Sequence, residues 1–69
     1  MQNNVLGQKL KEARFYKKAS QADVAKDLNM VESSYSKYEQ GKNEPSLDTL
    51  IILARYFNVT TDFLLGLED

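Results

Sequence analysis

The sequence predicts an all-α fold of five short helices. Apolar residues recur at helical spacing along almost the whole chain, and Asn, Ser, Thr or Gly stands at most points where a helix is expected to begin or end. Val31 and Val59 favour a strand, but neither lies in an alternating run. A chain of 69 residues has the length of one small domain, expected over 1–69 with its core in 5–66.

The first two helices have clear apolar faces and start signals. The first is expected over 5–17, with Asn3 or Asn4 as its N-cap. The second is expected to start after Ser20, a good N-cap, with Asp23 in its positive first turn. The inner faces of the two helices consist of Val5, Leu6, Leu10 and Ala13, and of Val24, Ala25 and Leu28.

A tight turn separates the second helix from the third. Asn29 tolerates a positive φ and is expected to make this turn. The third helix is expected over 32–40, with Tyr38 pointing in or along the helix seam and Gly41 as the C-terminal cap. Two short helices joined in this way can present the second of them to a groove of nucleic acid.

The last two helices follow a polar loop that ends at Pro45. Ser46 is expected to cap the fourth helix and Asn58 to end it. Thr60 or Thr61 is expected to cap a short fifth helix, which Gly66 closes. The predicted core positions of these two helices are Leu47, Leu50, Ile51, Leu53, Ala54 and Phe57, and Phe63, Leu64 and Leu65.

Basic residues are concentrated at the start of the chain. The net charge of −1 and the sequence pI of about 5.3 argue against nucleic acid as a partner, because phosphate binding needs a cationic surface. Residues 1–18, however, carry a charge of +4, and residues 19–69 a charge of −5. One face can therefore be positive although the whole chain is not. Alternatively, the lysines form only the solvated face of the first helix.

Composition excludes several kinds of site. The chain has no Cys and no His, so the usual metal ligands, a thiol nucleophile and the commonest general base are missing. Asp23 and Asp27 have neither a nucleophile nor a metal partner, so we expect no enzyme, no metal and no cofactor. The apolar stretches are too short to span a membrane and no secretion signal is recognisable, so we expect a cytoplasmic protein.

The chain resembles the helix-turn-helix family of lambda-type phage repressors and Cro proteins, also called Xre-like. The resemblance covers 5–66 and rests on five segments in this order: LKEAR, SQADVAKDL, YSKYEQGKNEPS, DTLIILARYFNV and DFLLG. It implies a lambda-repressor-like DNA-binding domain with the helix-turn-helix at the second and third helices. It also implies sequence-specific binding of double-stranded DNA by a transcriptional repressor or regulator, often as a dimer on a palindromic operator.

The resemblance implies that the third helix reads the major groove. Glu32, Ser33, Ser34 and Lys37 are then the base-reading residues. Lys can donate to guanine O6 and N7, Ser can pair with several bases, and Glu can accept from cytosine N4. Glu32 has an alternative role in the first turn of the helix, where a negative charge suits the helix dipole.

Backbone contacts are expected on both sides of the reading helix. Gln21, at the start of the second helix, is expected to bind phosphate through its amide and the free backbone N–H groups; the alternative is a solvated Gln. Lys42 and Asn43 are expected phosphate contacts that set the register. The resemblance places Arg14 against Glu39, in an ion pair that leaves Arg14 an N–H for phosphate; the alternative is two unrelated surface charges.

Three positions depart from the pattern of the family. Asn29 stands where a Gly is usual, Val31 where a Ser or Thr cap is usual, and Tyr35 where an aliphatic residue is usual. We expect slight strain at Asn29 and a poorly satisfied helix end after Val31. The Tyr35 ring either packs in or along the seam, or leans outward to touch sugar or phosphate.

The resemblance also implies a two-fold contact near the fifth helix. Phe57 and Leu64 are expected in the core, and the candidates for the contact are Tyr56, Asn58, Val59, Thr60 and Leu67. We expect a weak homodimer that tightens on DNA, with the two reading helices roughly 34 Å apart. The alternative function, which the low pI favours, is an antitoxin or protein-interaction module of a toxin–antitoxin or phage system.

Overall fold

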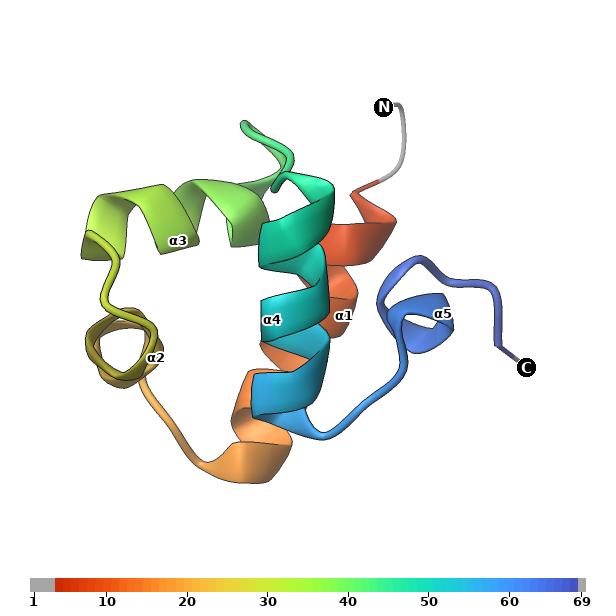
Figure 1. The fold of residues 1–69 in the computed structure, drawn as a ribbon, viewed down its shortest axis with the longest axis horizontal. Helices are drawn as coiled ribbons and strands as arrows, with labels where there is room; N and C mark the ends of the chain where they lie inside the picture. Colours follow the sequence, from red (N-terminus) through yellow and green to blue (C-terminus); the bar gives the residue numbers. More distant parts are fainter. Residues whose placement is uncertain (1–3, 69) are drawn as a thin grey trace.

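Five α-helices surround one core in the computed structural model, which describes residues 4–68 (Figure 1). They are α1 (Val5–Lys17), α2 (Gln21–Asp27), α3 (Glu32–Gln40), α4 (Leu47–Phe57) and α5 (Thr61–Leu64). The helices α1 and α4 lie in the centre, with α2 and α3 on one side of them and α5 on the other (Figure 1). The predicted all-α fold is confirmed, and the bounds expected for the first and third helices match those of α1 and α3.

Side chains satisfy the free N–H groups at four of these helix starts. Ser20 Oγ accepts from the backbone N–H of Asp23, and the Asp23 carboxylate accepts from the backbone N–H of Ser20, each at 3.0 Å. This capping box and three further N-caps, at Asn4, Ser46 and Thr60, confirm the predicted starts. Asn3, the other candidate at the start of the chain, lies outside the described residues. Val31 provides no side-chain cap for α3, as expected.

Residues in the left-handed region end three helices and shape the turn between α2 and α3. Asn29, Gly41 and Asn58 have φ values of 57°, 76° and 58°, as their positions predicted. Lys18 also has a φ of 60° at the end of α1, which the sequence did not indicate. Lys is poorly suited to this conformation because its Cβ approaches the following carbonyl oxygen.

The core lies between α1 and α4 and extends under α2, α3 and α5. Its buried apolar side chains are Leu10, Ala13, Val24, Ala25, Tyr35, Leu50, Leu53, Ala54, Phe57 and Leu64. The prediction of a core position is wrong for three residues: Leu47, Ile51 and Leu65 are 77%, 44% and 42% exposed. The buried face of α4 instead runs through Leu50, Leu53, Ala54 and Phe57, and Leu47 and Ile51 lie outside it. No helix within residues 4–68 is long and apolar enough to cross a membrane.

Candidate nucleic-acid interface

The helix α3 turns one face to the core and the other outward. Tyr35 and Glu39 are buried four residues apart on one face. The four residues expected to read bases lie elsewhere on the helix. Glu32, Ser33 and Lys37 are exposed, and Ser34 is half-buried. The structure therefore brings these four side chains to the accessible part of one short helix.

An ion pair between α1 and α3 holds the inner face of α3. Arg14 Nε donates to Glu39 Oε2 at 2.7 Å, and Arg14 Nη2 donates to Glu39 Oε1 at 3.1 Å. Tyr35 Oη donates to Oε2 at 2.6 Å and Gln21 Nε2 to Oε1 at 3.0 Å. The Glu39 side chain is only 1% exposed, so this carboxylate is buried with four hydrogen bonds that join α1, α2 and α3.

Burial and hydrogen bonding act in opposite directions on this carboxylate. Burial raises the pKa of Glu39, but the hydrogen bonds from Arg14, Tyr35 and Gln21 together outweigh it and hold the pKa below its usual value. The hydrogen bond to Glu39 raises the pKa of the Arg14 guanidinium. The pair is therefore charged on both sides at neutral pH.

Tyr35 has no access to DNA. Its side chain is fully buried, and burial followed by the hydrogen bond to Glu39 raises the pKa of its phenol. The prediction that this ring leans outward to touch sugar or phosphate is wrong; the ring packs inward instead. The reason is that Glu39 gives the hydroxyl a buried acceptor, so the ring can fill the core without leaving a polar group unsatisfied.

Gln21 and Arg14 lie beside each other but are largely engaged inside the protein. Gln21 is half-buried and donates to Glu39, so it is not the freely solvated residue of the alternative interpretation. Arg14 is 12% exposed and also donates from Nη1 to the carbonyl of Ala19 at 3.1 Å. The ring of Phe15 lies 5.0 Å from its guanidinium carbon. A guanidinium has five N–H donors, and three of them are used here.

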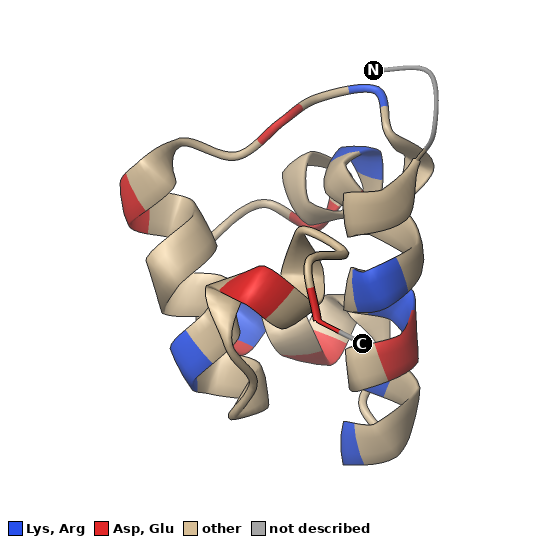
Figure 2. Cartoon of the chain, turned by 90° about the vertical axis from the view of Figure 1, so that its right-hand side faces the viewer, with Lys and Arg blue, Asp and Glu red and all other residues tan. Residues whose placement is uncertain are grey.

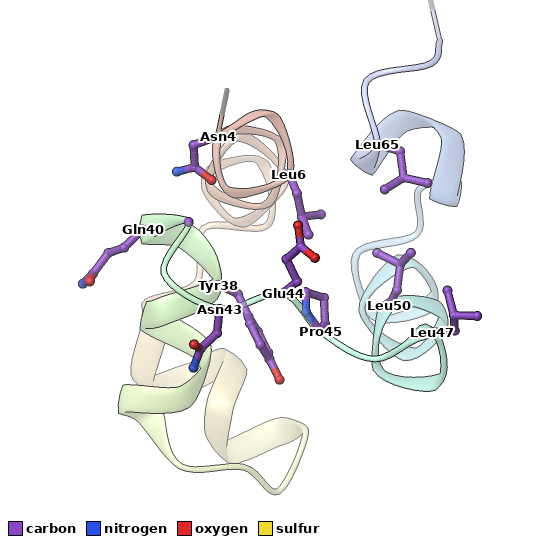
Figure 3. A pocket seen from close by; sticks show the side chains of 11 residues that line it. Asn4, Leu6, Tyr38, Gln40, Asn43, Glu44, Pro45, Leu47, Leu50 and Leu65 are labelled. Carbon is purple, nitrogen blue, oxygen red and sulfur yellow. The ribbon is translucent and has the colours of Figure 1, made fainter. Parts of the chain in front are cut away.

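The loop after α3 carries the other two expected phosphate contacts. Lys42 and Asn43 are both exposed, and their backbone N–H groups donate to the carbonyl of Lys37. Behind the loop is a pocket of about 440 Å³ (Figure 3). Its apolar lining includes Leu6, Leu50 and Leu65, and its polar lining includes Asn43 and Gln40. No group of acidic residues within 4–68 is arranged to hold a metal ion.

The residues expected near a two-fold contact differ in exposure. Asn58, Thr60 and Leu67 are exposed, whereas Tyr56 and Val59 are half-buried. Tyr56 Oη donates to Asp27 Oδ2 at 2.6 Å, which ties α4 to the end of α2. Burial, and then this hydrogen bond, raise the pKa of Tyr56 to about 12.

Sequence reasoning did not find the contact between the start of α1 and the end of α3. Asn4 Nδ2 donates to the backbone carbonyl of Glu39 at 2.8 Å. Gly7, in the first turn of α1, is buried at the same place. An isolated glycine inside a helical pattern lowers helix stability and often has a packing reason, and Gly7 was the sequence signal for this contact.

Figure 2 shows basic and acidic residues on several of the helices, so neither sign of charge is confined to one element. Five of the nine basic residues, Lys9, Lys11, Arg14, Lys17 and Lys18, lie on or directly after α1. Lys9 and Lys17 lie over the rings of Phe63 and Tyr56, at 4.9 and 4.7 Å. These two cations therefore help to pack α1 against its neighbours.

A tight turn between two short helices, with the second helix exposed on one face, defines a helix-turn-helix domain. The chain belongs to the helix-turn-helix family, whose model matches residues 10–64. The chain is 41% identical over 64 residues to the HTH-type transcriptional regulator ImmR of Bacillus subtilis (strain 168). These aligned residues cover 93% of this chain and 50% of that protein. It is 44% identical over 61 residues to the SPbeta prophage-derived uncharacterized HTH-type transcriptional regulator YonR of the same organism, covering 88% of this chain and 56% of that protein.

A third relative is the HTH-type transcriptional activator BcrR of Enterococcus faecalis, 34% identical over 62 residues that cover 90% of this chain and 30% of that protein. The chain thus spans about half the length of the first two relatives. The family is one of DNA-binding transcription regulators and not of enzymes. This agrees with the function predicted from the sequence.

Proposed function

We propose that this domain binds double-stranded DNA and reads the major groove with α3, as part of a transcription regulator. The observation that carries the proposal is the combination of an exposed α3 face with an ion pair behind it whose carboxylate is buried and hydrogen-bonded. A helix that reads base edges must be accessible and must also be held at a fixed angle. Membership of the helix-turn-helix family supports the same conclusion.

Roles within the interface follow from exposure. Lys37 and Ser33 are the best placed to meet base edges, with Ser34 and Glu32 at the sides of the helix. Lys42 and Asn43 bind phosphate after α3, and Gln21 and Arg14 bind it on the other side with the N–H groups that Glu39 and Ala19 leave free. Base contacts would then lie between two rows of backbone contacts.

A homodimer on a palindromic site is the second part of the proposal. The exposed side chains Asn58, Thr60 and Leu67 supply the contact, together with the accessible parts of Tyr56 and Val59. Sedimentation of the free chain and of its complex with a palindromic duplex tests this part. Monomers in both samples would contradict it.

Selection of bound oligonucleotides from a random pool tests DNA binding directly. A recovered sequence should then respond differently to two variants. Lys37→Ala should change the preference at particular base pairs, whereas Lys42→Ala should weaken all sequences about equally and lower the salt slope by about 1. Identical behaviour of the two variants would contradict the assignment of α3 as the reader.

A further inference from the structure

The side chain of Asn4 joins the first turn of α1 to the last turn of α3. Its Oδ1 accepts from the backbone N–H of Gly7 at 3.2 Å, and its Nδ2 donates to the carbonyl of Glu39 at 2.8 Å. Figure 3 shows Asn4 beside the end of α3. The last carbonyl groups of a helix lack partners within the helix, so Asn4 satisfies a group that would otherwise need water.

Gly7 allows the two helices to meet at this point. A Cβ atom on Gly7 would lie 2.3 Å from the carbonyl oxygen of Glu39, which is a backbone atom and cannot rotate away. Glycine in a helix interior lowers stability relative to alanine. Its presence here is explained by the close approach, and any other residue would push the end of α3 away from α1.

Glu39 is therefore attached to α1 through both its backbone and its side chain. Its carbonyl is held by Asn4 at the start of α1, and its carboxylate by Arg14 in the last turn of α1. Two attachment points on different parts of Glu39 fix the direction of α3 relative to α1 as well as its position. At the opposite end of α3, Val31 makes no capping hydrogen bond through its side chain.

The angle set at Glu39 decides where the outward side chains of α3 lie. Ser33 is six residues from Glu39, about 9 Å along the helix axis, so a tilt of about 10° would move it by about 1.5 Å. Hydrogen-bond lengths fall within about 2.7–3.2 Å, a range about 0.5 Å wide, and the displacement is about three times that width. A base-reading contact near the start of α3 would not survive it.

We infer that Asn4 and Gly7 are positioning residues for base reading: their contact with the Glu39 carbonyl sets the angle of α3 and thereby the sequence specificity of the domain. This inference rests on the proposed function. It concerns residues outside the predicted interface, since Gly7 has no side chain and the Asn4 side chain is turned towards α1 and α3.

Three variants separate positioning from stability. Asn4→Asp keeps an oxygen for the Gly7 N–H but cannot donate to Glu39, and Gly7→Ala inserts the clashing Cβ. Leu64→Val removes core volume from α5, on the far side of the α1 and α4 pair, and serves as the control. For each variant, urea unfolding gives the stability. Binding is compared on an oligonucleotide that the unmodified chain selects and on a scrambled duplex.

We expect Asn4→Asp and Gly7→Ala to lower the ratio of selected to scrambled affinity at least about fivefold, the loss of one good base contact. Leu64→Val should leave this ratio unchanged. Residual dipolar couplings of the DNA-free protein should report a changed angle between α1 and α3 in the first two variants only. If Gly7→Ala does not fold, Asn4→Asp still decides the question.

Two results would overturn the inference: an unchanged specificity ratio in Asn4→Asp, or unchanged dipolar couplings in α3. Failure of the unmodified chain to select any oligonucleotide would instead overturn the proposed function. The dipolar couplings would still show whether the contact sets the angle of α3, so the two failures are distinguishable.

Discussion

Replacing Arg14 with Met should destabilise the fold by about 3–5 kcal/mol at neutral pH. Met retains much of the apolar stem but removes the guanidinium, and the Glu39 carboxylate then stays buried with only Tyr35 and Gln21 as donors. Domains of this size have a free energy of unfolding of only about 3–10 kcal/mol. The loss is therefore a large fraction of the total free energy of unfolding.

The loss of stability caused by Arg14→Met should become smaller as the pH is lowered. In the unmodified chain, burial raises the pKa of Glu39 but its hydrogen bonds outweigh burial and lower it. The ionised carboxylate therefore stabilises the fold fully above the unfolded pKa of about 4.3, and this contribution is lost as the pH falls through the lowered folded pKa. Without Arg14, burial should prevail and raise the pKa of Glu39, so the variant should become relatively more stable as Glu39 protonates.

Urea unfolding followed by circular dichroism, near neutral pH and at about pH 4, measures both effects. Arg55→Met is the matched control, because Arg55 is exposed and has no ion pair within the described residues; its loss should stay below about 0.5 kcal/mol. The double variant Arg14→Met/Glu39→Met should recover part of the loss, since no carboxylate remains buried. A loss below about 1 kcal/mol at neutral pH, or one that grows on acidification, would refute the reasoning.

Val31→Ser should supply the N-cap that α3 lacks and stabilise the fold by about 1 kcal/mol. Calorimetry should then show a melting temperature raised by about 4–8 °C. An unchanged melting temperature would show that Ser does not cap α3 at this position. Burial and the hydrogen bond to Asp27 raise the pKa of Tyr56 to about 12, so one tyrosine should titrate there in tyrosinate absorbance. The hydrogen bond from Tyr56 to Asp27 should contribute fully to stability below about pH 10, the ordinary pKa of tyrosine, and this contribution should be lost as the pH rises to about 12. Asp27→Ala should lower the pKa of Tyr56. Asn29→Ala should destabilise the fold by about 1 kcal/mol in urea, because Ala tolerates a φ of 57° less well than Asn; equal stability would argue against strain at this turn.

Local signals in the sequence were enough to predict the helices. Ser20 with Asp23, Ser46 and Gly41 act within one or two turns of themselves, so their effect on helix ends is independent of distant residues. Lys18 was missed because lysine carries no preference for a positive φ; the end of α1 imposes it.

The pairing of Arg14 with Glu39 was expected only through resemblance to a family. Nothing local in the sequence joins residues 25 positions apart. Gln21 and Tyr35, the further partners of Glu39, came from the structure, and the hydrogen bond to Tyr35 rules out the outward orientation expected as one alternative. Tyr35 in particular had two open orientations, and the buried acceptor decided between them.

The sequence by itself determined which segments are helical and where most of them begin and end, because apolar period and capping are properties of neighbouring residues. Only the tertiary structure decided which side chains of α4 remain exposed and how α1 holds α3 through Asn4, Gly7 and Arg14. The physical reason is that burial and hydrogen bonding between helices depend on the angle at which their axes cross, and that angle results from the packing of all the helices together.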